Sequence, residues 1–396
     1  MLWTLEPEVS MIVAEKMARY MEKSSWIRRM FEEGSRLKAI HGAENVFDFS
    51  LGNPDVPPPE TVLERMSELA LTMNHGYMAN AGYPDVRAAV AGYASSLYEV
   101  PLAAGDIVMC CGAGGGLNAV LKAVTNPGDE VIAISPYFVE YGFYVENHGG
   151  TLVVAESGPD FLPSLENIRA AMTGRTRAII INSPNNPTGR VYPREVLAGL
   201  AGLLKDRPDI LVISDEPYRR LVYGGRQVPS VLKEVPCSVV VTSASKELSL
   251  AGERIGYIAV GPGVKDKGTL TNALVLATRI LGFVNAPALM QQVYASCLGE
   301  SVDISQYEAR RDLFMKILDS AGLTYVPPEG AFYLFVKSPL QDDVAFCTKL
   351  LEENILAVPG MGFGWPGYVR FTYCVSIESI RGCAPGLKRV MAGISG

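Results

Sequence analysis

Lys246 follows an apolar run at residues 238–242 that is rich in β-branched side chains. A run of this length is typical of a buried strand, so the lysine is expected just beyond a strand end. Ligands of open α/β sheets bind in the crevice beyond the carboxyl ends of the strands. An ammonium there, flanked by Ser243 and Ser245 and followed eight residues later by Arg254, could hold an aldehyde and a phosphate. For this stretch alone, a solvated loop lysine is the alternative.

Two other apolar runs also end in polar residues. The run 178–182 leads into Ser-Pro-Asn-Asn-Pro-Thr-Gly, and the run 210–213 leads into Ser-Asp-Glu-Pro-Tyr. Three predicted strand ends therefore each carry a polar cluster, and the two additional clusters supply Asn186, Asp215 and Tyr218. Every residue of Asn-Pro-Thr-Gly favours a turn, and Asp215 could cap a turn or a helix, so purely structural roles stay open for both.

A glycine-rich segment, Cys-Gly-Ala-Gly-Gly-Gly-Leu, begins at Cys111 after a predicted strand and opens a predicted helix that runs to about Val124. Small residues let the backbone approach an anion closely, and the free N–H groups and dipole of a helix start favour a phosphate. A dinucleotide fingerprint would require glycine at position 117, which is Leu117. The segment therefore predicts a site for a single phosphate.

The chain of 396 residues is 48% hydrophobic and 19% charged, which suits a globular protein with a large core and, at this length, two domains. Its net charge is −7, with acids and bases interspersed and no basic run that would follow a nucleic-acid backbone. No run of about eighteen apolar residues could span a membrane. The first residues lack the basic and apolar segments of a secretory signal. We therefore expect a cytoplasmic protein that binds neither nucleic acid nor membrane.

The seven cysteines are scattered without a Cys-x-x-Cys pair, which favours reduced thiols that serve as small apolar side chains. The three histidines, His41, His75 and His148, do not have the spacing of metal ligands. We expect no metal site, and the sequence disfavours a zinc enzyme or a Ser-His-Asp hydrolase.

Short β-branched runs alternate with helical periods along most of the chain, which indicates crossover units and an α/β fold with a mainly parallel sheet. A proline-rich link at residues 57–59 is typical of a crossing between domains. We predict an N-terminal segment and part of a small domain at residues 1–55, a large domain at 56–295, and a small C-terminal α+β domain at 296–396.

The individual elements are predicted from the same patterns. Residues 11–45 are predicted to be helical, with Ser24 or Ser25 as a cap. Further predicted helices are 60–73, 85–98, 112–124, 165–172, 193–205, 304–321, 342–353 and 377–392, with one or two more within 267–300. The predicted strands are 47–51, 107–110, 131–135, 151–155, 178–182, 210–213, 238–242, 255–260, 332–336, 355–358 and 369–375.

Three motifs, in their order and spacing, resemble those of the class I and II aminotransferases, a family that includes aspartate aminotransferase and uses pyridoxal phosphate. They are Asn-Pro-Thr-Gly at 186–189, Asp-x-x-Tyr at 215–218, and Ser-x-Ser-Lys at 243–246 with its following arginine. The resemblance implies fold type I, in which helices flank a mainly parallel, seven-stranded sheet and a smaller α+β domain lies beside it. It also implies a homodimer with shared active sites.

The resemblance implies that four side chains would contact the reacting groups of the cofactor. Lys246 would hold pyridoxal phosphate as a Schiff base and move the substrate proton, and desolvation and nearby positive charge would lower its pKa for this role. Asp215 would keep the ring nitrogen protonated, which makes the ring a good electron sink. Tyr218 and Asn186 would hydrogen-bond the phenolic oxygen of the ring.

Other residues would hold the cofactor's ring and phosphate. Phe138 would stack on the ring, or it fills the core instead. Tyr77 would reach the phosphate of the neighbouring subunit, or it packs within its own loop instead. Arg254 could meet two phosphate oxygens at once, as a guanidinium does. The predicted phosphate ligands are the side chains of Ser243, Ser245 and Arg254 and the amides of Gly112, Ala113 and Gly114.

Three residues match positions that bind the substrate in the family. Arg370 would take the α-carboxylate, although an arginine between apolar strand residues can also form an edge or an ion pair. Gly52 would bring the backbone close to that carboxylate, and Asn186 would lie beside it. A dicarboxylate donor would need a second cation, for which Arg279 is the nearest candidate, although the sequence favours an arginine on a helix surface at this position.

We therefore expect an enzyme that moves an amino group from an L-amino acid to a 2-oxo acid through pyridoxamine phosphate. β-Elimination from a cysteine conjugate by a C–S lyase and cyclisation of a sulfonium amino acid are alternatives on the same scaffold. A cofactor-binding sensor without turnover is disfavoured, because the sequence before residue 45 is too short for a DNA-binding segment. Residues 282–285 and 329–333 could line an apolar pocket for the substrate side chain.

Overall fold

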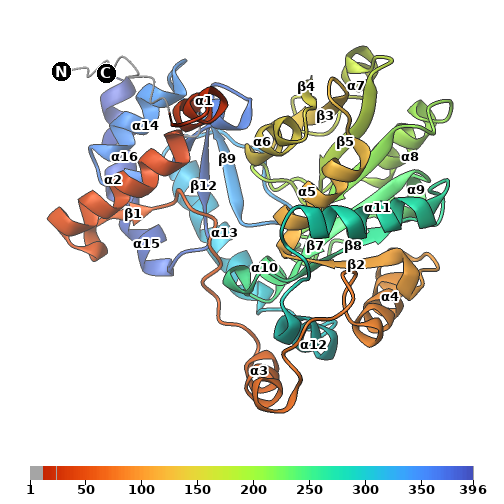
Figure 1. The fold of residues 1–396 in the computed structure, drawn as a ribbon. Helices are drawn as coiled ribbons and strands as arrows, with labels where there is room; N and C mark the ends of the chain where they lie inside the picture. The colour runs from red at the N-terminus through yellow and green to blue at the C-terminus, as the bar shows by residue number, and fades with distance from the viewer. Residues whose placement is uncertain (1–11, 24, 396) are drawn as a thin grey trace.

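The computed structural model describes residues 12–23 and 25–395, and for residues 22, 23, 25–31 and 395 it describes the backbone alone. Figure 1 shows a larger part built around one sheet and a smaller part beside it. In the smaller part the first helices of the chain lie next to its last helices and strands. Within the described ranges, no helix has both the length and the apolar character needed to cross a membrane.

The sheet of the larger part, here called the central sheet, has seven strands in the described chain, in the order β2-β8-β7-β6-β5-β3-β4. Strand β8 runs antiparallel to both neighbours, and the other adjacent pairs are parallel. The predicted α/β fold with a mainly parallel sheet is therefore confirmed. The strands are β2 (Ile107–Cys110), β3 (Glu130–Ser135), β4 (Thr151–Glu156), β5 (Thr176–Asn182), β6 (Leu211–Asp215), β7 (Ser238–Ser243) and β8 (Gly256–Val260).

Both faces of the central sheet are buried, except along the edge strand β4, where most side chains are exposed or half-buried. Ile132 and Ile134 belong to one hydrophobic cluster, whereas Val131 and Ala133, from the same strand, belong to another. Successive side chains of a strand point to opposite faces, so the two clusters lie on the two sides of the sheet. Burial on both faces explains why these strands appear in the sequence as continuous apolar runs without alternation.

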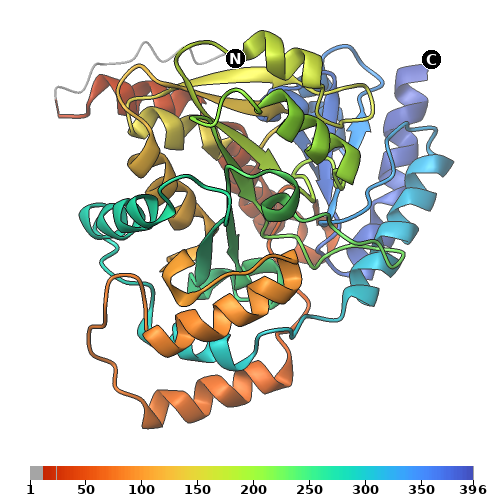
Figure 2. The same cartoon turned by 90° about the vertical axis from the view of Figure 1, so that its right-hand side faces the viewer.

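Helices cover both faces, and α3 packs against α12 at the periphery of the molecule (Figure 2). The helices that contribute to the first cluster are α3 (Glu60–Thr72), α4 (Pro84–Tyr98), α7 (Leu165–Ala171), α8 (Arg194–Leu203), α9 (Val231–Glu234), α10 (Ala244–Glu247) and α12 (Ala288–Ser296). Those that contribute to the second are α5 (Gly112–Val124), α6 (Glu140–Asn147) and α11 (Lys267–Ile280).

The smaller part has its own core, in which the rings of Phe49 and Phe314 lie 4.8 Å apart. Its antiparallel sheet has the order β11-β12-β9, and a separate parallel pair joins β1 to β10. Its strands are β1 (Phe47–Asp48), β9 (Tyr333–Lys337), β10 (Ile355–Leu356), β11 (Val358–Pro359) and β12 (Tyr368–Thr372). Its helices are α13 (Ile304–Ser320), α14 (Asp343–Leu351), α15 (Ile377–Gly382) and α16 (Ala384–Ser395).

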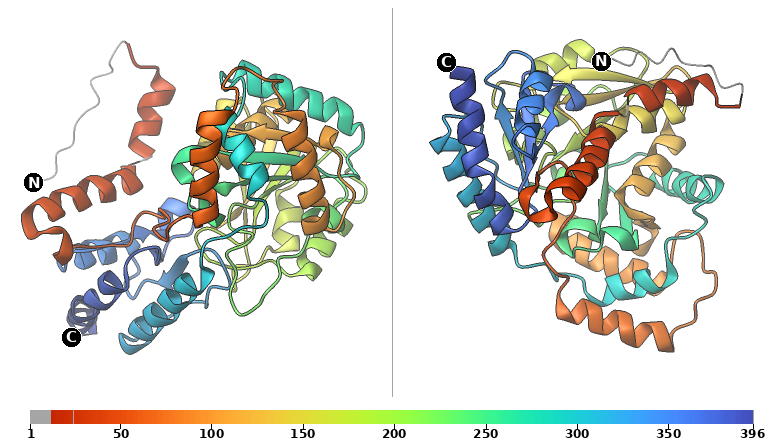
Figure 3. Two further views of the ribbon diagram at one scale, coloured as in Figure 1. Left: turned by 90° about the horizontal axis from the view of Figure 1, so that it is seen from below. Right: turned by 90° about the vertical axis from the view of Figure 1, so that its left-hand side faces the viewer.

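The N-terminal helices α1 (Glu15–Lys23) and α2 (Ser25–His41) connect the two parts (Figure 3). Helix α2 is held to the smaller part by Lys38, whose Nζ lies 2.9 Å from Asp48 Oδ2. Helix α1 contacts α6 of the larger part, where Tyr20 Oη donates to Glu146 Oε2 at 2.6 Å. Ser24 lies outside the described residues, as does the Ser25 side chain, so the predicted cap stays a prediction.

Several element boundaries differ from the predictions. The predicted helix 377–392 is two helices, because Pro385 lacks an N–H and fits only the first turn of a new helix. The predicted strand 355–358 is split between β10 and β11, which pair with different strands. The predicted strand 47–51 is shortened to β1, and α6 was not predicted.

The parallel strands bring their carboxyl ends to one edge of the central sheet. Asn182, the last residue of β5, lies directly opposite Asp215, the last residue of β6. Strand β7 ends at Ser243 and continues into the one-turn helix α10 (Ala244–Glu247), which carries Lys246. The short 3₁₀ helices are η1 (Ala43–Asn45), η2 (Ala104–Asp106), η3 (Ala251–Glu253) and η4 (Gly360–Phe363).

Candidate active site

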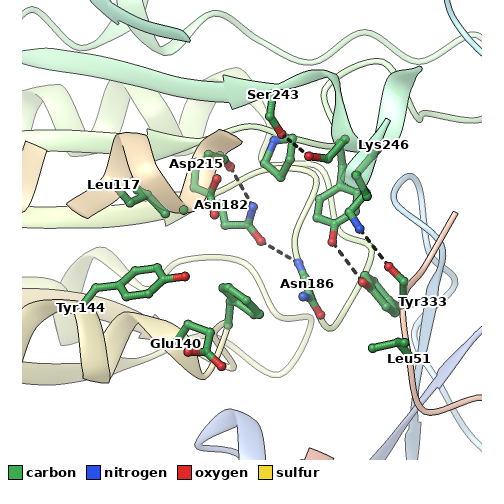
Figure 4. Close-up of a pocket in the computed structure, with 18 of the residues that line it drawn as sticks. Leu51, Leu117, Glu140, Tyr144, Asn182, Asn186, Asp215, Ser243, Lys246 and Tyr333 are labelled. Atoms are coloured by element: carbon green, nitrogen blue, oxygen red, sulfur yellow. Dashed lines mark hydrogen bonds between the residues drawn. The ribbon is translucent and has the colours of Figure 1, made fainter. Parts of the chain in front are cut away.

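A cavity of about 360 Å³ lies at this edge, between the ends of β5, β6 and β7 and strands β9 and β12 of the smaller part (Figure 4). Most of the predicted site residues line it, although they come from distant parts of the sequence. These residues are Gly52, Ala113, Gly114, Phe138, Asn186, Asp215, Tyr218, Ser243, Ser245, Lys246, Arg254 and Arg370.

Lys246 projects into the cavity from the short helix that follows β7. Its Nζ donates to the carbonyl oxygen of Gly52 at 2.8 Å and lies 5.5 Å from the centre of the Phe332 ring. Desolvation, with the positive charges of Arg370 and Arg254, lowers the pKa of the amine to about 8. About a tenth of this amine is therefore deprotonated at pH 7, and this part is available as a nucleophile or base.

Asp215 is buried at the end of β6, and one of its two carboxylate oxygens accepts a hydrogen bond from a described residue. Tyr141 Oη donates to Asp215 Oδ2 at 2.6 Å, whereas Oδ1 is buried and has no hydrogen-bond partner among the described residues. Burial, opposed by the Tyr141 hydrogen bond, raises the pKa of the carboxyl to about 7. A buried acceptor without a donor is costly, so Oδ1 points to a bound ligand that carries an N–H or a positive charge.

Asn186 and Tyr218 lie on the side of the cavity that faces the smaller part. The backbone N–H of Asn186 donates to Asn182 Oδ1 at 2.7 Å, and the peptide bond from Asn186 to Pro187 is cis. The hydroxyls of Tyr218 and Tyr333 are 3.0 Å apart. Burial raises the pKa of the Tyr218 hydroxyl, so Tyr218 remains a protonated donor at neutral pH.

Arg370 is buried on β12 and bridges the two parts of the molecule. Its Nη1 donates to Asn186 Oδ1 at 3.0 Å, and its Nη2 donates to the carbonyl oxygen of Ser50 at 2.6 Å. Its guanidinium carbon lies 4.5 Å from the Tyr333 ring centre and 4.7 Å from that of Phe363. The Nε atom is buried and has no hydrogen-bond partner in the part of the chain that the structure describes. No carboxylate neutralises this buried cation within the described chain, so an anionic ligand would complete its environment.

A second group of residues surrounds the N-terminal turn of α5. Gly112 has a φ of +68°, a left-handed conformation that favours glycine, and a Cβ at this position would lie 2.8 Å from Arg254 Nη2. Ser243 Oγ donates to Ser245 Oγ at 3.0 Å. Arg254 donates to the carbonyl oxygen of Ala251 at 3.0 Å, and its side chain is exposed. Helix amides, hydroxyls and a guanidinium in one place are suited to a phosphate.

Of the remaining predicted residues, Phe138 lies in the cavity, whereas Tyr77 and Arg279 lie outside its lining. Phe138 lines the cavity, where its ring packs edge-on against Tyr141 at 5.7 Å. Tyr77 does not line it, because its side chain is 92% exposed beside a groove formed with Phe283 and Val284. Arg279 is exposed on α11 and also lies outside the lining of the cavity.

Sequence reasoning missed several residues of the site. Tyr141, which holds Asp215, lies in the same short segment as Phe138, and this nearness was the available signal. Asn182 ends a predicted strand, and its Nδ2 donates to the carbonyl oxygen of Asp215 at 2.7 Å. Tyr333 was considered only as part of an apolar pocket. Glu140 and Tyr144 face the cavity from the side opposite Lys246 (Figure 4), and no motif distinguished them.

Comparisons with known proteins agree with this geometry. Residues 44–384 match the family model described as aminotransferase class I and II. A protein of Thermotoga maritima named aspartate aminotransferase is 34% identical over 360 residues, covering 89% of this chain and 94% of that protein. An aspartate/prephenate aminotransferase of Thermus thermophilus is 35% identical over 347 residues, covering 86% of this chain and 89% of that protein.

Solved structures give the same result. The crystal structure of an aminotransferase from Eubacterium rectale has a TM-score of 0.93 at 39% identity, covering 98% of this chain and 100% of that chain. The crystal structure of an aspartate aminotransferase from Thermotoga maritima has a TM-score of 0.85 at 31% identity, covering 95% and 99%. The fold is therefore fold type I, as predicted. With a family model matched over most of its length, this chain belongs to the class I and II aminotransferases.

Proposed function

We propose that this aminotransferase uses pyridoxal phosphate, attached through Lys246, to move an amino group from an L-amino acid to a 2-oxo acid. The observation that carries the proposal is that Lys246 and Asp215 line one cavity from neighbouring strand ends. The first is an amine with a lowered pKa, and the second is a buried carboxylate with one unpartnered oxygen. The amine would react with the aldehyde of the cofactor, and the carboxylate would accept a hydrogen bond from its protonated ring nitrogen.

The residues present fit this cofactor. Asp215 Oδ1 would accept from the ring N–H, and this partner would lower the pKa of the carboxyl from its present value of about 7. The Tyr218 hydroxyl and the Asn186 side chain would lie on the phenolic side of the ring, and Phe138 would pack on its face. The phosphate would lie among Ser243, Ser245, Arg254 and the amides of Gly112, Ala113 and Gly114. When bound, pyridoxal phosphate supplies an electron sink for the charge left at the substrate α-carbon.

The chain's own contribution to catalysis would be binding and proton transfer. Arg370 would bind the α-carboxylate of the donor, because its unpartnered Nε and buried charge favour an anion. That contact would fix the α-hydrogen near Lys246 Nζ, which would take the proton from the α-carbon. The buried surroundings of both side chains would exclude water from the transfer.

We also propose the domain division predicted from the sequence, with residues 1–55 and 296–396 contributing to the small domain and 56–295 forming the large one. Two hydrophobic clusters lie almost wholly within residues 56–295 and a third lies mainly in the small domain, which supports this division. Arg370 hydrogen-bonds across it to Asn186. Movement of the small domain would therefore be coupled to occupation of the carboxylate site.

A homodimer in which Tyr77 reaches the phosphate of the second subunit is part of the proposal. The support is a surface on α3, α11 and the loop 73–83 that carries exposed apolar side chains, including Leu71 and Ile280. A second copy would cover this surface. Sedimentation velocity at micromolar concentration is expected to give twice the chain mass of 42.7 kDa. All seven cysteines are free thiols, which supports a cytoplasmic location.

The charges that line the cavity bear on the choice of donor. In the described part of the chain its cations are Lys246, Arg254 and Arg370, and each has a role in the proposal. Glu140 adds a half-buried carboxylate that forms no hydrogen bond or ion pair with another described residue. The relatives named aspartate aminotransferase support a dicarboxylate donor. A second carboxylate near Glu140 would be repelled unless the other subunit supplies a cation.

The test is a single-turnover experiment on purified protein reconstituted with pyridoxal phosphate. We expect a yellow protein whose long-wavelength absorbance is bleached by a good amino donor and restored by a 2-oxo acid. Pyruvate and ammonia are measured in the same samples without any acceptor, because their release would indicate β-elimination instead. A protein that stays colourless with excess cofactor, or forms a static adduct without releasing a keto acid, would contradict the proposal.

A further inference from the structure

The hydroxyl of Tyr144 lies over the N-terminal turn of α5, where Gly114 has no side chain. A Cβ placed on Gly114 would lie 3.1 Å from Tyr144 Oη and 4.0 Å from Arg254 Nη2. The hydroxyl and the guanidinium therefore approach the same small space from two sides. Tyr144 reaches it from α6, an element separate from both α5 and the loop that carries Arg254.

This hydroxyl has no partner within the described part of the molecule. Tyr144 Oη forms no hydrogen bond with another described residue, although its ring is half-buried and lines the cavity. Desolvation, together with the carboxylates of Glu140 and Asp215, raises the pKa of Tyr144 to about 12. The group is therefore a protonated hydroxyl at neutral pH, with a free hydrogen to donate into the cavity.

We infer that Tyr144 donates a hydrogen bond to the phosphate of the cofactor, at the position in the phosphate site that Gly114 leaves without a side chain. The inference rests on the proposed function, because it assumes a phosphate beside Arg254. It adds a ligand from α6 to the predicted set from α5, β7 and Arg254. It also explains why residue 114 is small, since a larger side chain there would crowd the hydroxyl.

The alternative role for Tyr144 is packing, since its ring packs against the hydrophobic cluster that includes Leu117; both residues are labelled in Figure 4. Replacement by phenylalanine separates the two roles, because it keeps the ring and removes only the oxygen. A neutral hydroxyl bound to a charged phosphate is among the stronger hydrogen bonds, and its loss is expected to weaken binding about tenfold to a hundredfold.

The experiment titrates apo-protein with pyridoxal phosphate and, separately, with pyridoxal, which lacks the phosphate. Binding is followed by absorbance and by quenching of protein fluorescence. Tyr144→Phe is expected to weaken binding of pyridoxal phosphate about tenfold or more and to leave binding of pyridoxal unchanged. Tyr137→Phe is the matched control, because it removes a hydroxyl from the same segment at a half-buried position outside the cavity lining.

A rescue variant tests the geometry. In Tyr144→Phe the oxygen that would crowd residue 114 is gone, so adding Gly114→Ser places a new hydroxyl at the same site. The double variant is expected to regain most of the affinity for pyridoxal phosphate. Gly114→Ser alone is expected to gain nothing, because its Cβ would meet Tyr144 Oη at 3.1 Å.

The outcomes that would overturn the inference are distinct from failure of the proposed function. Equal weakening of pyridoxal and pyridoxal phosphate by Tyr144→Phe would assign the ring a packing role. Unchanged binding of both would show that the hydroxyl contacts no phosphate. If the unaltered protein binds neither compound, the proposed function fails, whereas a normal unaltered protein with an unaffected variant refutes only the role of Tyr144.

Discussion

Lys246 Nζ donates a hydrogen bond to the carbonyl oxygen of Gly52 at 2.8 Å, although 194 residues separate them in the sequence. The lysine follows the last strand of the parallel group, and the glycine lies in the segment that leaves the smaller part of the molecule. The resting position of the lysine therefore depends on how the two parts pack.

The lowered pKa of Lys246 predicts how cofactor attachment depends on pH. Only the deprotonated amine attacks an aldehyde, and its pKa is about 8. The rate constant for attachment to apo-protein is expected to rise about tenfold between pH 6 and 7 and to level off above pH 8. Stopped-flow absorbance measures it. Lys246→Ala should show no covalent step, whereas Lys122→Ala, an exposed lysine on α5, should behave normally. A profile rising without a plateau to pH 10 would contradict the lowered pKa.

Gly52 is expected to tolerate no side chain. A Cβ there would lie 2.0 Å from Tyr333 Oη, so Gly52→Ala forces the segment or the tyrosine to move. Overpacking of this kind costs about 1 to 3 kcal/mol of unfolding free energy, and the displaced carbonyl would release Lys246. Denaturant unfolding and cofactor attachment are both measured. Adding Tyr333→Phe should restore part of the loss. Gly252→Ala is the control, because a Cβ there meets nothing within 4 Å.

Asp215 should make the apo-protein less stable as the pH rises. Burial raises its pKa from about 3.8 to about 7, so the folded state holds a proton that the unfolded state has lost. Its contribution to stability is complete below about pH 4 and is lost as the pH rises through 7, by at most about 4 kcal/mol. Asp215→Asn should remove this part of the pH dependence in apo-protein unfolding curves from pH 4.5 to 8. Identical slopes for both proteins would exclude the effect.

Replacing Arg370 should slow the reaction of donors that carry an α-carboxylate and leave donors without one unchanged. Arg370→Lys keeps the charge but loses the planar pair of donors, and it leaves Asn186 and Ser50 without their present partner. We expect kcat/KM for α-amino acids to fall about a hundredfold, mainly through KM. Bleaching by an amine that lacks the α-carboxylate is the internal control and should be unchanged. If both kinds of donor are slowed equally, Arg370 has a structural role instead.

Glu140 should disfavour donors with a second carboxylate. Its carboxylate lines the cavity without a partner among the described residues, so Glu140→Gln removes a like charge from the space for the substrate side chain. The rate of bleaching by aspartate and glutamate is expected to rise about tenfold relative to that by alanine. Glu156→Gln, which neutralises an exposed carboxylate at the end of β4, should leave the ratio unchanged. A ratio that does not respond to Glu140→Gln would place the side-chain site elsewhere.

Local sequence patterns were enough to identify the strands of the central sheet and the polar residues at their carboxyl ends. The runs before Asn186, Asp215 and Lys246 are apolar and short, and the carboxyl ends of parallel strands share one edge, so these residues could be expected together. The glycine-rich start of α5 could be identified for the same reason, since its conformation and its anion preference are both local properties.

Other residues of the site are far apart in the sequence, and they come together only because whole helices and strands pack against one another. Tyr141 meets Asp215 across 74 residues, and Tyr333 meets Tyr218 across 115. A lone tyrosine in a helix or strand carries no local signal of such a partner. The local sequence around Tyr77 likewise does not reveal its partner, because the predicted contact requires a second copy of the chain. Periodicity and motifs report the conformation of residues that are close in the sequence. Contacts between elements form only when helices and strands pack together around the hydrophobic clusters.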